Sequence, residues 1–181
     1  MAQLFINIIG FNAAGKTTLA KKLENELHFN RVSGDDFRDF AQTHIAYFDM
    51  VPRSHSTEKY KQLNPLVMSY RLDMTKTLLL AGQNVIYDGS GNTKAYRKIY
   101  LDLVAKTAPH VKVVLITVKA DEQTIVERLH KRTDGKNWLE MYENRKKSFE
   151  PSTQEEADLL LEYDQNNYQD IKEAISKLLK S

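Results

Sequence analysis

Residues 10–17 have the sequence GFNAAGKT, which matches the pattern G-x-x-x-x-G-K-[ST] of a phosphate-binding loop in full. Glycines let the backbone curl until successive N–H groups point into one anion-sized hollow, and a helix starting at Lys16 would add the positive end of its dipole. In such a loop the Lys16 ammonium reaches the β- and γ-phosphates of a nucleotide, and the Thr17 hydroxyl holds Mg²⁺. We therefore expect ATP and Mg²⁺ as cofactors. The expected nucleotide contacts are Gly10, Asn12, Ala13, Ala14, Gly15, Lys16, Thr17 and Thr18.

A second group of chemically competent side chains lies in the sequence SGDDFR at residues 33–38. A carboxylate here can take the proton from an incoming hydroxyl, and an arginine one helical turn later can hold an anionic group of the substrate. One of two adjacent aspartates is also suited to cap a helix that begins near Phe37. We assign the helix cap to Asp36, the catalytic base to Asp35 and the substrate contact to Arg38.

Asp88 ends the apolar run VIYD and is followed by Gly89. An acid in this position can hold Mg²⁺ through water, or it can orient the phosphate acceptor. The alternative is structural, because an aspartate before a glycine can form an Asx turn where a strand ends. We predict that Asp88 is a metal or substrate ligand, and the sequence leaves these two roles open.

Arg128 and Arg132 lie four residues apart in a segment with helical periodicity, so we expect them to share one helix face. Phosphoryl transfer leaves negative charge on the equatorial oxygens, and a guanidinium binds such charge through a bidentate fork. We predict Arg132 as a catalytic residue and Arg128 as a nucleotide contact. The alternative is a solvated basic face, since His130 and Lys131 lie between them.

These motifs occur where short apolar segments end, in a chain that alternates strands with helices. Such alternation predicts a doubly wound α/β fold, a five-stranded parallel sheet with helices on both faces and ligands at the carboxyl ends of its strands. Residues 39–57 are expected to be irregular. The expected strands are residues 4–9, 31–33, 84–88, 111–118 and 158–163. The expected helices are residues 16–27, 65–81, 93–106, 121–132 and 168–180, and Gly82 is expected to stop the second of these.

Residues 128–151 are polar, basic and aromatic, and we expect them to form a small lid on a single domain that spans residues 1–181. Arg145 is a further candidate for lid chemistry. Arg97, by contrast, is expected to lie on the surface of its helix. The aromatic residues expected to pack the lid onto the core are Trp138, Tyr142 and Phe149.

Together these segments resemble the kinase domain of bacteriophage polynucleotide kinase, and the wider set of P-loop kinases that includes zeta toxins and chloramphenicol phosphotransferase. The similarity extends over nearly the whole chain, from Leu4 to about Asp164. Besides the phosphate-binding loop, the segments that carry it are VSGDDFR at residues 32–38, VIYDGSGN at 85–92, ERLHKR at 127–132 and NRKKSFEP at 144–151.

The resemblance implies a sheet with the strand order 23145 and transfer of the γ-phosphate of ATP to a hydroxyl. It also implies that Asp35 is the base, that Arg38 contacts a substrate phosphate and that Arg132 stabilises the γ-phosphate. The chain departs from the phage kinase after the third strand, where Ser90 replaces an asparagine and Asn92 stands two residues further on.

The acceptor cannot be read from the sequence. It is either the 5′-hydroxyl end of a nucleic acid or nucleotide, or a small metabolite that carries a hydroxyl. The alternative function is a nucleotide-dependent switch that hydrolyses ATP without a phosphoryl acceptor. Such a switch needs no acceptor base and gains nothing from a lid that excludes water, so the pairing of Asp35 with Arg38 favours the kinase.

The composition narrows the class of protein further. The chain has no cysteine, which excludes disulfides, thiolate catalysis and cysteine-based metal sites and fits a reducing compartment. A net charge of +2 is too small to argue for nucleic acid or anionic lipid by itself. No apolar stretch approaches the roughly eighteen residues that a membrane span requires. We expect a cytoplasmic enzyme without a membrane partner, whose oligomeric state the sequence leaves open.

Overall fold

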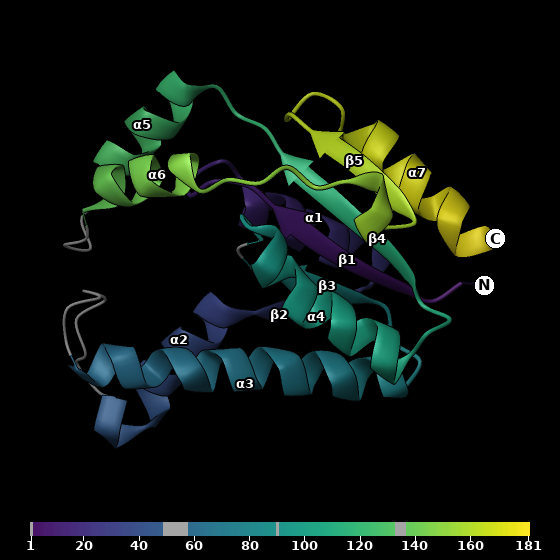
Figure 1. The fold of residues 1–181 in the computed structure, drawn as a ribbon, viewed down its shortest axis with the longest axis horizontal. Coiled ribbons are helices and arrows are strands. Elements are labelled where there is room, and N and C mark those ends of the chain that lie inside the picture. Colours follow the sequence, from purple (N-terminus) through teal and green to yellow (C-terminus); the bar gives the residue numbers. More distant parts are fainter. Residues whose placement is uncertain (1, 49–57, 90, 133–136) are drawn as a thin grey trace.

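The computed structural model describes residues 2–48, 58–89, 91–132 and 137–181. Its centre is a five-stranded parallel sheet with the order β2-β3-β1-β4-β5 (Figure 1). The predicted fold class and strand order are confirmed. The strands are β1 (Leu4–Ile9), β2 (Asn30–Ser33), β3 (Val85–Asp88), β4 (Lys112–Val118) and β5 (Leu159–Tyr163).

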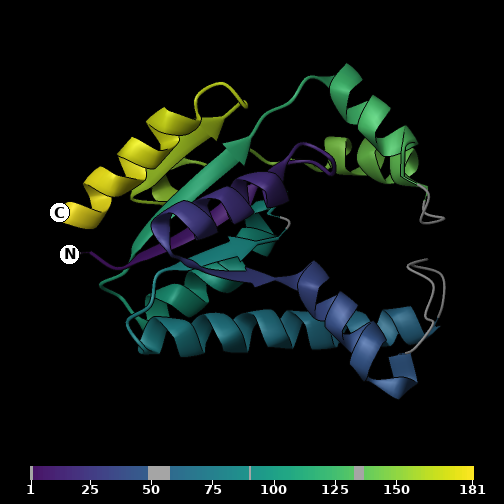
Figure 2. The same ribbon diagram turned by 180° about the vertical axis from the view of Figure 1, so that it is seen from behind.

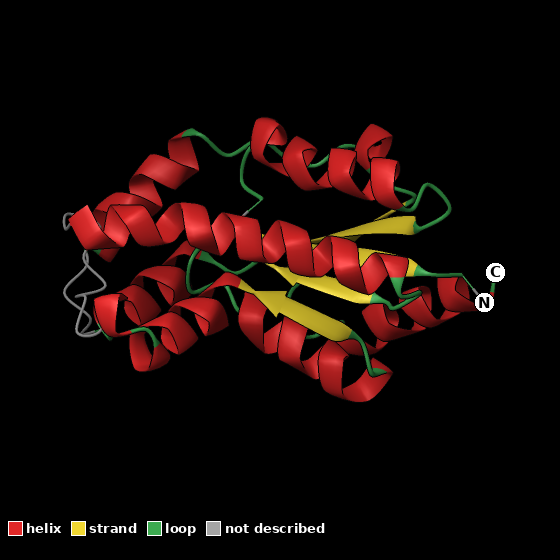
Figure 3. Cartoon of the chain, turned by 90° about the horizontal axis from the view of Figure 1, so that it is seen from below, coloured by secondary structure: helices red, strands yellow, loops and turns green. Residues whose placement is uncertain are grey.

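Helices cover both faces of the sheet (Figure 3). On one face, α1 (Lys16–Leu27) and α7 (Tyr168–Lys180) pack their apolar residues against alternate side chains of β1 such as Ile6. On the other face, α3 (Glu58–Leu80) and α4 (Lys94–Thr107) enclose a second cluster around Phe5. Every residue of β1 is buried, as a central strand of a parallel sheet requires.

The strands end along one edge of the sheet, where the remaining helices lie. In Figure 1, α5 (Glu122–His130) and α6 (Trp138–Lys147) stand on one side of this edge, and α2 (Gly34–His44) with the start of α3 stands on the other. Figure 2 shows the same division from behind. Parallel strands direct the residues that follow them to a common edge, so the predicted motifs meet there.

The start of α2 differs from the prediction. The helix begins at Gly34, and its cap is Ser33, whose hydroxyl accepts a hydrogen bond from the Asp36 backbone N–H at 3.2 Å. Asp36 is therefore not the cap. The helix continues to His44, so residues 39–44 are helical where an irregular segment was expected. The last part of that expected segment, residues 49–57, lies outside the described residues.

The helices α3 and α5 also have different ends from those predicted. α3 begins at Glu58 and contains Pro65, although an internal proline removes a backbone hydrogen bond and costs roughly 3 kcal/mol. Leu63 and Val67 lie on either side of the proline in sequence and are both buried, so tertiary packing outweighs this local cost. α5 ends at His130, which leaves Arg132 beyond the helix rather than on its face.

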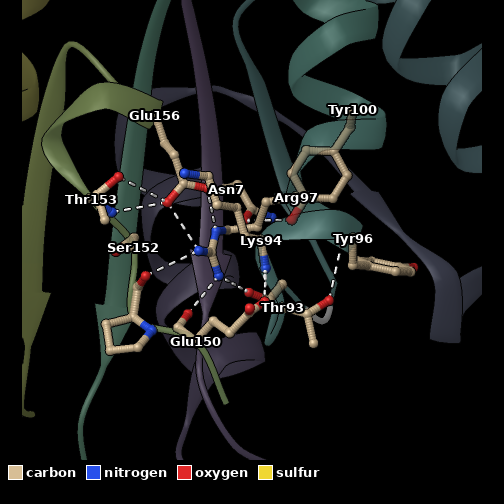
Figure 4. Close-up of polar contacts among 12 residues, drawn as sticks. Asn7, Thr93, Lys94, Tyr96, Arg97, Tyr100, Glu150, Ser152, Thr153 and Glu156 are labelled. Carbon is tan, nitrogen blue, oxygen red and sulfur yellow. Dashed lines mark hydrogen bonds and ion pairs between the residues drawn. The ribbon is translucent and has the colours of Figure 1, made fainter. Parts of the chain in front are cut away.

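Arg97 on α4 is fully buried, so the expectation of a surface residue was wrong. Its guanidinium forms a bidentate ion pair with Glu156, at 2.8 and 2.9 Å. It also donates to the carbonyls of Gly91, Glu150 and Pro151 at 2.8–3.1 Å (Figure 4). This network attaches the segment that returns from α6 to the end of the sheet, and the periodicity of α4 alone could not reveal a partner 59 residues away.

None of the helices in the described ranges combines the length and apolar composition needed to cross a membrane.

Candidate active site

One cavity of about 740 Å³ lies at the carboxyl edge of the sheet. It brings together residues from β3, from the loop after β1, from α2 and from the α5–α6 region. The predicted site residues that line it are Asn12, Ala13, Gly15, Lys16, Thr17, Thr18, Asp35, Arg38, Asp88, Arg128 and Arg132. The cavity is also lined by residues that were not predicted as ligand contacts, namely Gly34, Arg71, Gly89, Tyr96, Trp138, Met141, Arg145, Tyr163 and Gln165.

The loop between β1 and α1 has the geometry of an anion-binding hollow. Ala13 and Gly15 both have positive φ values, of 62° and 107°, which turn the backbone around the site. Gly15 is the N-cap of α1, and among the described residues no side chain caps this helix. The first N–H groups of α1 are thus left for a phosphate to bind.

Two predicted loop residues do not line the cavity. Gly10 has a φ of 144°, and a Cβ there would lie 2.8 Å from the carbonyl oxygen of Val118. A glycine is thus required by the close approach of β4 rather than by a ligand. The side chain of Ala14 is fully buried in the core beneath the loop. Both residues therefore contribute to the conformation of the loop from the side that faces the core.

Lys16 lies at the centre of the charges in the cavity. Its ammonium donates to the carbonyl of Phe11 at 2.7 Å. Burial lowers its pKa to about 8, and the positive charge of Arg145 adds to this effect, while Asp88 and Asp35 oppose it. A lysine surrounded in this way favours negative ligand charge, because an anion restores the interactions that the ammonium loses with water.

Asp88 connects the end of β3 to the phosphate-binding loop. One carboxylate oxygen accepts from the Thr17 hydroxyl at 3.4 Å, and the other accepts from Arg31 at 3.1 Å. Burial raises the pKa of Asp88, although Arg31 and Lys16 act in the opposite direction. Arg31, which the sequence analysis did not select, also pairs with Glu24 and Asp36 and so ties β2 to this acid.

Asp35 and Arg38 lie on the first turn of α2. The guanidinium of Arg38 donates to Asp35 at 2.9 Å and to the Asn64 side chain at 3.1 Å. The side chain of Asp35 is 77% exposed, so its carboxylate remains accessible from the cavity despite this ion pair. The pair therefore places an accessible carboxylate beside a guanidinium, and the roles of Asp35 as base and Arg38 as substrate contact stay predictions.

Three arginines reach the cavity from the α5–α6 side. Arg128 donates to the carbonyl of Ala13 at 3.0 Å, and Arg145 donates to the Asn12 side chain. The guanidinium of Arg132 lies 4.4 Å from the centre of the Trp138 ring. Arg128 and Arg132 line the same cavity although Arg132 lies beyond the end of α5.

The aromatic residues of the α6 region pack against the phosphate-binding loop. The Phe11 ring lies 5.3 Å from the ring of Tyr142 and 5.0 Å from that of Phe149. Tyr142 is buried. The predicted packing of Tyr142 and Phe149 onto the core is thus confirmed, and Trp138 packs against the same cluster while holding Arg132.

The loop after β3 includes Ser90 and Asn92, the two residues named above where the chain departs from the phage kinase. Ser90, where the chain departs from the phage kinase, lies outside the described residues. Asn92, two residues further on, is buried and does not line the cavity. Its carbonyl accepts from the Glu150 backbone instead, so its observed role is to join this loop to the segment after α6.

Arg71 is the most informative residue that the sequence analysis missed. It lies on α3 and lines the cavity, yet its side chain is buried. A sequence signal existed: Leu63, Val67, Arg71, Thr75 and Leu79 recur at intervals of four residues and are all buried. A cation on the core-facing stripe of a helix indicates a partner inside the molecule.

A family profile described as an AAA domain matches residues 5–151. No protein of curated function matches the sequence significantly. Among solved structures, a candidate kinase from Chloroflexus aurantiacus J-10-fl is 20% identical, with a TM-score of 0.75 over 98% of each chain.

Two further solved structures are similar. A sugar kinase from Janibacter sp. HTCC2649 is 18% identical, with a TM-score of 0.63 over 97% of this chain and 94% of that one. Shikimate kinase from Acinetobacter baumannii, in complex with shikimate, is 14% identical, with a TM-score of 0.58 over 98% of this chain and 93% of that one. At these identities the similarity concerns the fold, which is that of P-loop kinases.

Proposed function

The chain belongs to the AAA domain family, and from this premise we propose that it is an ATP-dependent kinase that transfers the γ-phosphate to a hydroxyl of its acceptor. One observation supports this most: the phosphate-binding residues, an accessible carboxylate and several arginines line a single cavity. Lys16 and Thr17 provide the nucleotide side of the cavity, and Asp35 with Arg38 provides the acceptor side.

The residues Thr17 and Asp88 would suit a magnesium ion. Their side-chain oxygens lie 3.4 Å apart, and Mg²⁺ prefers such hard oxygen ligands together with water and phosphate oxygens. We propose that Thr17 is a direct ligand and that Asp88 acts through water. When bound, the ion neutralises charge on the β- and γ-phosphates.

In the transfer step, the acceptor oxygen forms a bond to the γ-phosphorus while the bond to the leaving oxygen of ADP breaks. Asp35 accepts the hydroxyl proton as this oxygen attacks. Lys16 and Arg132 stabilise the charge on the transferred group, and Arg128 holds the nucleotide beside Ala13. These groups come from separate elements of the fold, so the reaction requires the folded cavity.

The acceptor class follows from the resemblance to the phage polynucleotide kinase group. We propose either a 5′-hydroxyl nucleic acid or nucleotide, or a small hydroxyl-bearing metabolite. Residues 1–181 would act as a single kinase domain whose lid, about residues 128–151, closes over the phosphates. The contacts of Arg128 and Arg145 with the phosphate-binding loop support this division.

The test is a screen of phosphate acceptors with labelled ATP and magnesium, including a 5′-hydroxyl oligonucleotide, nucleosides and sugars. We expect label transfer to at least one acceptor and ADP release that depends on that acceptor. ATP hydrolysis that no acceptor increases would instead support the nucleotide-dependent switch. Lys16→Ala serves as the inactive control and should lose about a thousandfold or more of the turnover.

A further inference from the structure

Arg71 carries a positive charge that no carboxylate in the described part of the chain neutralises. Its residue surface is 5% exposed, and no ion pair links it to another described residue. One terminal nitrogen, Nη1, donates to the Tyr96 hydroxyl at 3.1 Å, and the guanidinium lies 4.1 Å from the centre of the Tyr87 ring. A buried charge without a counter-charge is costly, so its presence in a cavity wall calls for a ligand.

The unsatisfied atoms of Arg71 form one edge of its guanidinium. Nε and Nη2 are buried and have no hydrogen-bond partner among the described residues. These two nitrogens point their N–H groups in the same direction, which is the arrangement that binds both oxygens of a carboxylate or phosphate. The rest of the group is already oriented by Tyr96 and Tyr87, so the free edge is held in place before any ligand binds.

The surroundings of Arg71 identify the acceptor side of the cavity. A Cβ on Gly89 would lie 1.5 Å from Nη2 of Arg71, so the Arg71 guanidinium packs directly against this position after β3 and would have to move to admit a larger residue. A Cβ on Gly34 would lie 3.1 Å from Arg71 Cδ and 3.5 Å from Nη1 of Arg38. Arg71 therefore lies beside Arg38 on the side of the cavity that contains Asp35, at the ends of β2 and β3.

The charges that line the cavity also favour a second anionic ligand besides the nucleotide. Its described lining has six cationic side chains, Lys16, Arg38, Arg71, Arg128, Arg132 and Arg145, but two carboxylates, Asp35 and Asp88. Magnesium cancels part of the charge of ATP, so the bound nucleotide leaves positive charge for a second anion. Of the cations, Arg71 and Arg38 lie on the acceptor side.

We propose that Arg71 is a substrate-binding residue that holds a carboxylate or phosphate of the acceptor through Nε and Nη2. The acceptor is then a hydroxyl compound with its own negatively charged group. This inference rests on the proposed kinase function. It narrows the acceptor class to anionic compounds.

The first experiment measures anion binding with the nucleotide site filled. The intact protein is saturated with magnesium and the non-hydrolysable analogue adenylyl imidodiphosphate, and its melting temperature is followed while inorganic phosphate or malonate is added. We expect at least one of the two anions to bind and raise the melting temperature further, and Arg71→Met to weaken that binding at least about tenfold. The comparison of phosphate with malonate tells which anionic group is preferred.

Two further variants test whether the effect on anion binding is specific to the guanidinium of Arg71. Arg71→Lys keeps the charge but loses the two-nitrogen edge, so it should bind the anion more weakly than the wild type. Lys76→Met removes an exposed cation from the same helix and should bind like the wild type. Equal anion binding by Arg71→Met and the wild type would overturn the proposal, and Arg71→Lys tests it should the methionine variant not fold.

The second experiment compares matched acceptors that differ in one anionic group: glycerate with glycerol, glucose 6-phosphate with glucose, and a nucleoside 3′-monophosphate with its nucleoside. We expect phosphorylation of the anionic member of at least one pair to exceed that of its neutral partner at least tenfold, and Arg71→Met to remove this preference. Equal use of both members by the wild type would overturn the inference while leaving the kinase function intact. Failure of the analogue itself to stabilise the protein would contradict the kinase function, while the comparison of anion binding between Arg71→Met and wild type remains a test of Arg71.

Discussion

At the scale of single residues, Lys16 shows how burial and neighbouring charge prepare a group for its ligand. Its pKa is lowered to about 8, mainly by burial and then by Arg145. The ammonium therefore predominates below pH 8 in the free protein and is lost above it. Because phosphate binds the ammonium form, the affinity for nucleotide depends on this titration.

We accordingly expect the affinity for MgATP to be nearly constant from pH 7 to 8 and to fall by up to about tenfold per pH unit above pH 8. Isothermal titration calorimetry between pH 7 and 9.5 measures this directly. Lys16→Met should bind weakly with little dependence on pH over this range. An affinity of the wild type that does not change up to pH 9.5 would contradict the prediction.

Asp35→Asn separates a kinase from a switch. The substitution keeps the size of the side chain but removes its ability to accept a proton, so phosphorylation of the acceptor should fall by roughly a hundred- to ten-thousandfold. The affinity for ATP should hardly change, because the phosphates are bound by other residues. Stability should change little, since Ser33 and not Asp35 caps α2.

Asp36→Asn is the matched control for this prediction. Asp36 lies next to Asp35 but points to Arg31 rather than into the cavity. Its substitution should leave phosphoryl transfer within a few-fold of the wild type. If Asp35→Asn transfers phosphate normally, Asp35 is not the base and Asp88 becomes the remaining carboxylate in the cavity.

Arg132→Ala tests whether an arginine from the lid acts on the transition state. We expect turnover to fall by roughly a hundredfold or more, while the dissociation constant for MgATP changes by less than about threefold. Single-turnover kinetics and nucleotide titration provide the two measurements. Weakened ATP binding with unchanged turnover at saturation would make Arg132 a ground-state contact instead.

At the scale of elements, the position of α6 depends on contacts at both of its sides. α6 contacts the phosphate-binding loop through Arg145, Tyr142 and the neighbouring Phe149. Its return to the sheet is held by Arg97 on α4, which binds the backbone of the segment after α6. Two attachments therefore hold the α6 segment beside the cavity.

Arg97→Met should destabilise the protein by about 3–5 kcal/mol, because it leaves Glu156 as a buried charge without its partner. Urea unfolding measures this change. Lys98→Met, at the next position, breaks an exposed pair with Asp102 and should cost less than about 1 kcal/mol. The double variant Arg97→Met with Glu156→Met should recover part of the loss. A loss below 1 kcal/mol in the single variant would show that the network contributes little.

At the scale of the whole molecule, the parallel sheet gathers groups from distant parts of the sequence at one edge. A ligand that bridges these groups binds the folded state alone, so it should stabilise the entire domain. MgATP at one hundred times its dissociation constant contributes about 2.7 kcal/mol, which corresponds to a rise in melting temperature of about 5–10 °C for a chain of this size.

Differential scanning calorimetry with and without EDTA tests this prediction together with the magnesium assignment. Chelation of magnesium should remove most of the rise, and Thr17→Ala should resemble the chelated wild type. The control is Lys172→Met on the far helix α7, where Lys172 forms a surface ion pair with Glu26 of α1. This variant should keep the full rise in melting temperature. An equal rise in the presence of EDTA would argue against the proposed metal site.

The sequence by itself determined the strand order of the sheet, the approximate positions of most strands and helices, and the motifs that depend on local spacing. The loop around Lys16 and the acids after β2 and β3 are marked by spacing within a few residues, because glycines, strand ends and helix starts act over that distance. The helix cap was also a local feature, yet the sequence predicted Asp36 where the structure has Ser33, because serine and aspartate both cap helices well and the exact end of β2 decides which one does so.

The tertiary structure decided the rest. Arg97 and Arg71 both occupy helix positions that look polar in sequence, and each is buried because of partners or cavity walls from other elements. Arg97 meets Glu156, 59 residues away, and Arg71 meets Tyr96, 25 residues away. Contacts over such separations depend on how the helices pack across the sheet, so the spacing within α3 can mark Arg71 as core-facing but cannot identify its partner. The folded structure alone therefore distinguishes Arg97, which is paired with Glu156, from Arg71, whose Nε and Nη2 have no hydrogen-bond partner among the described residues.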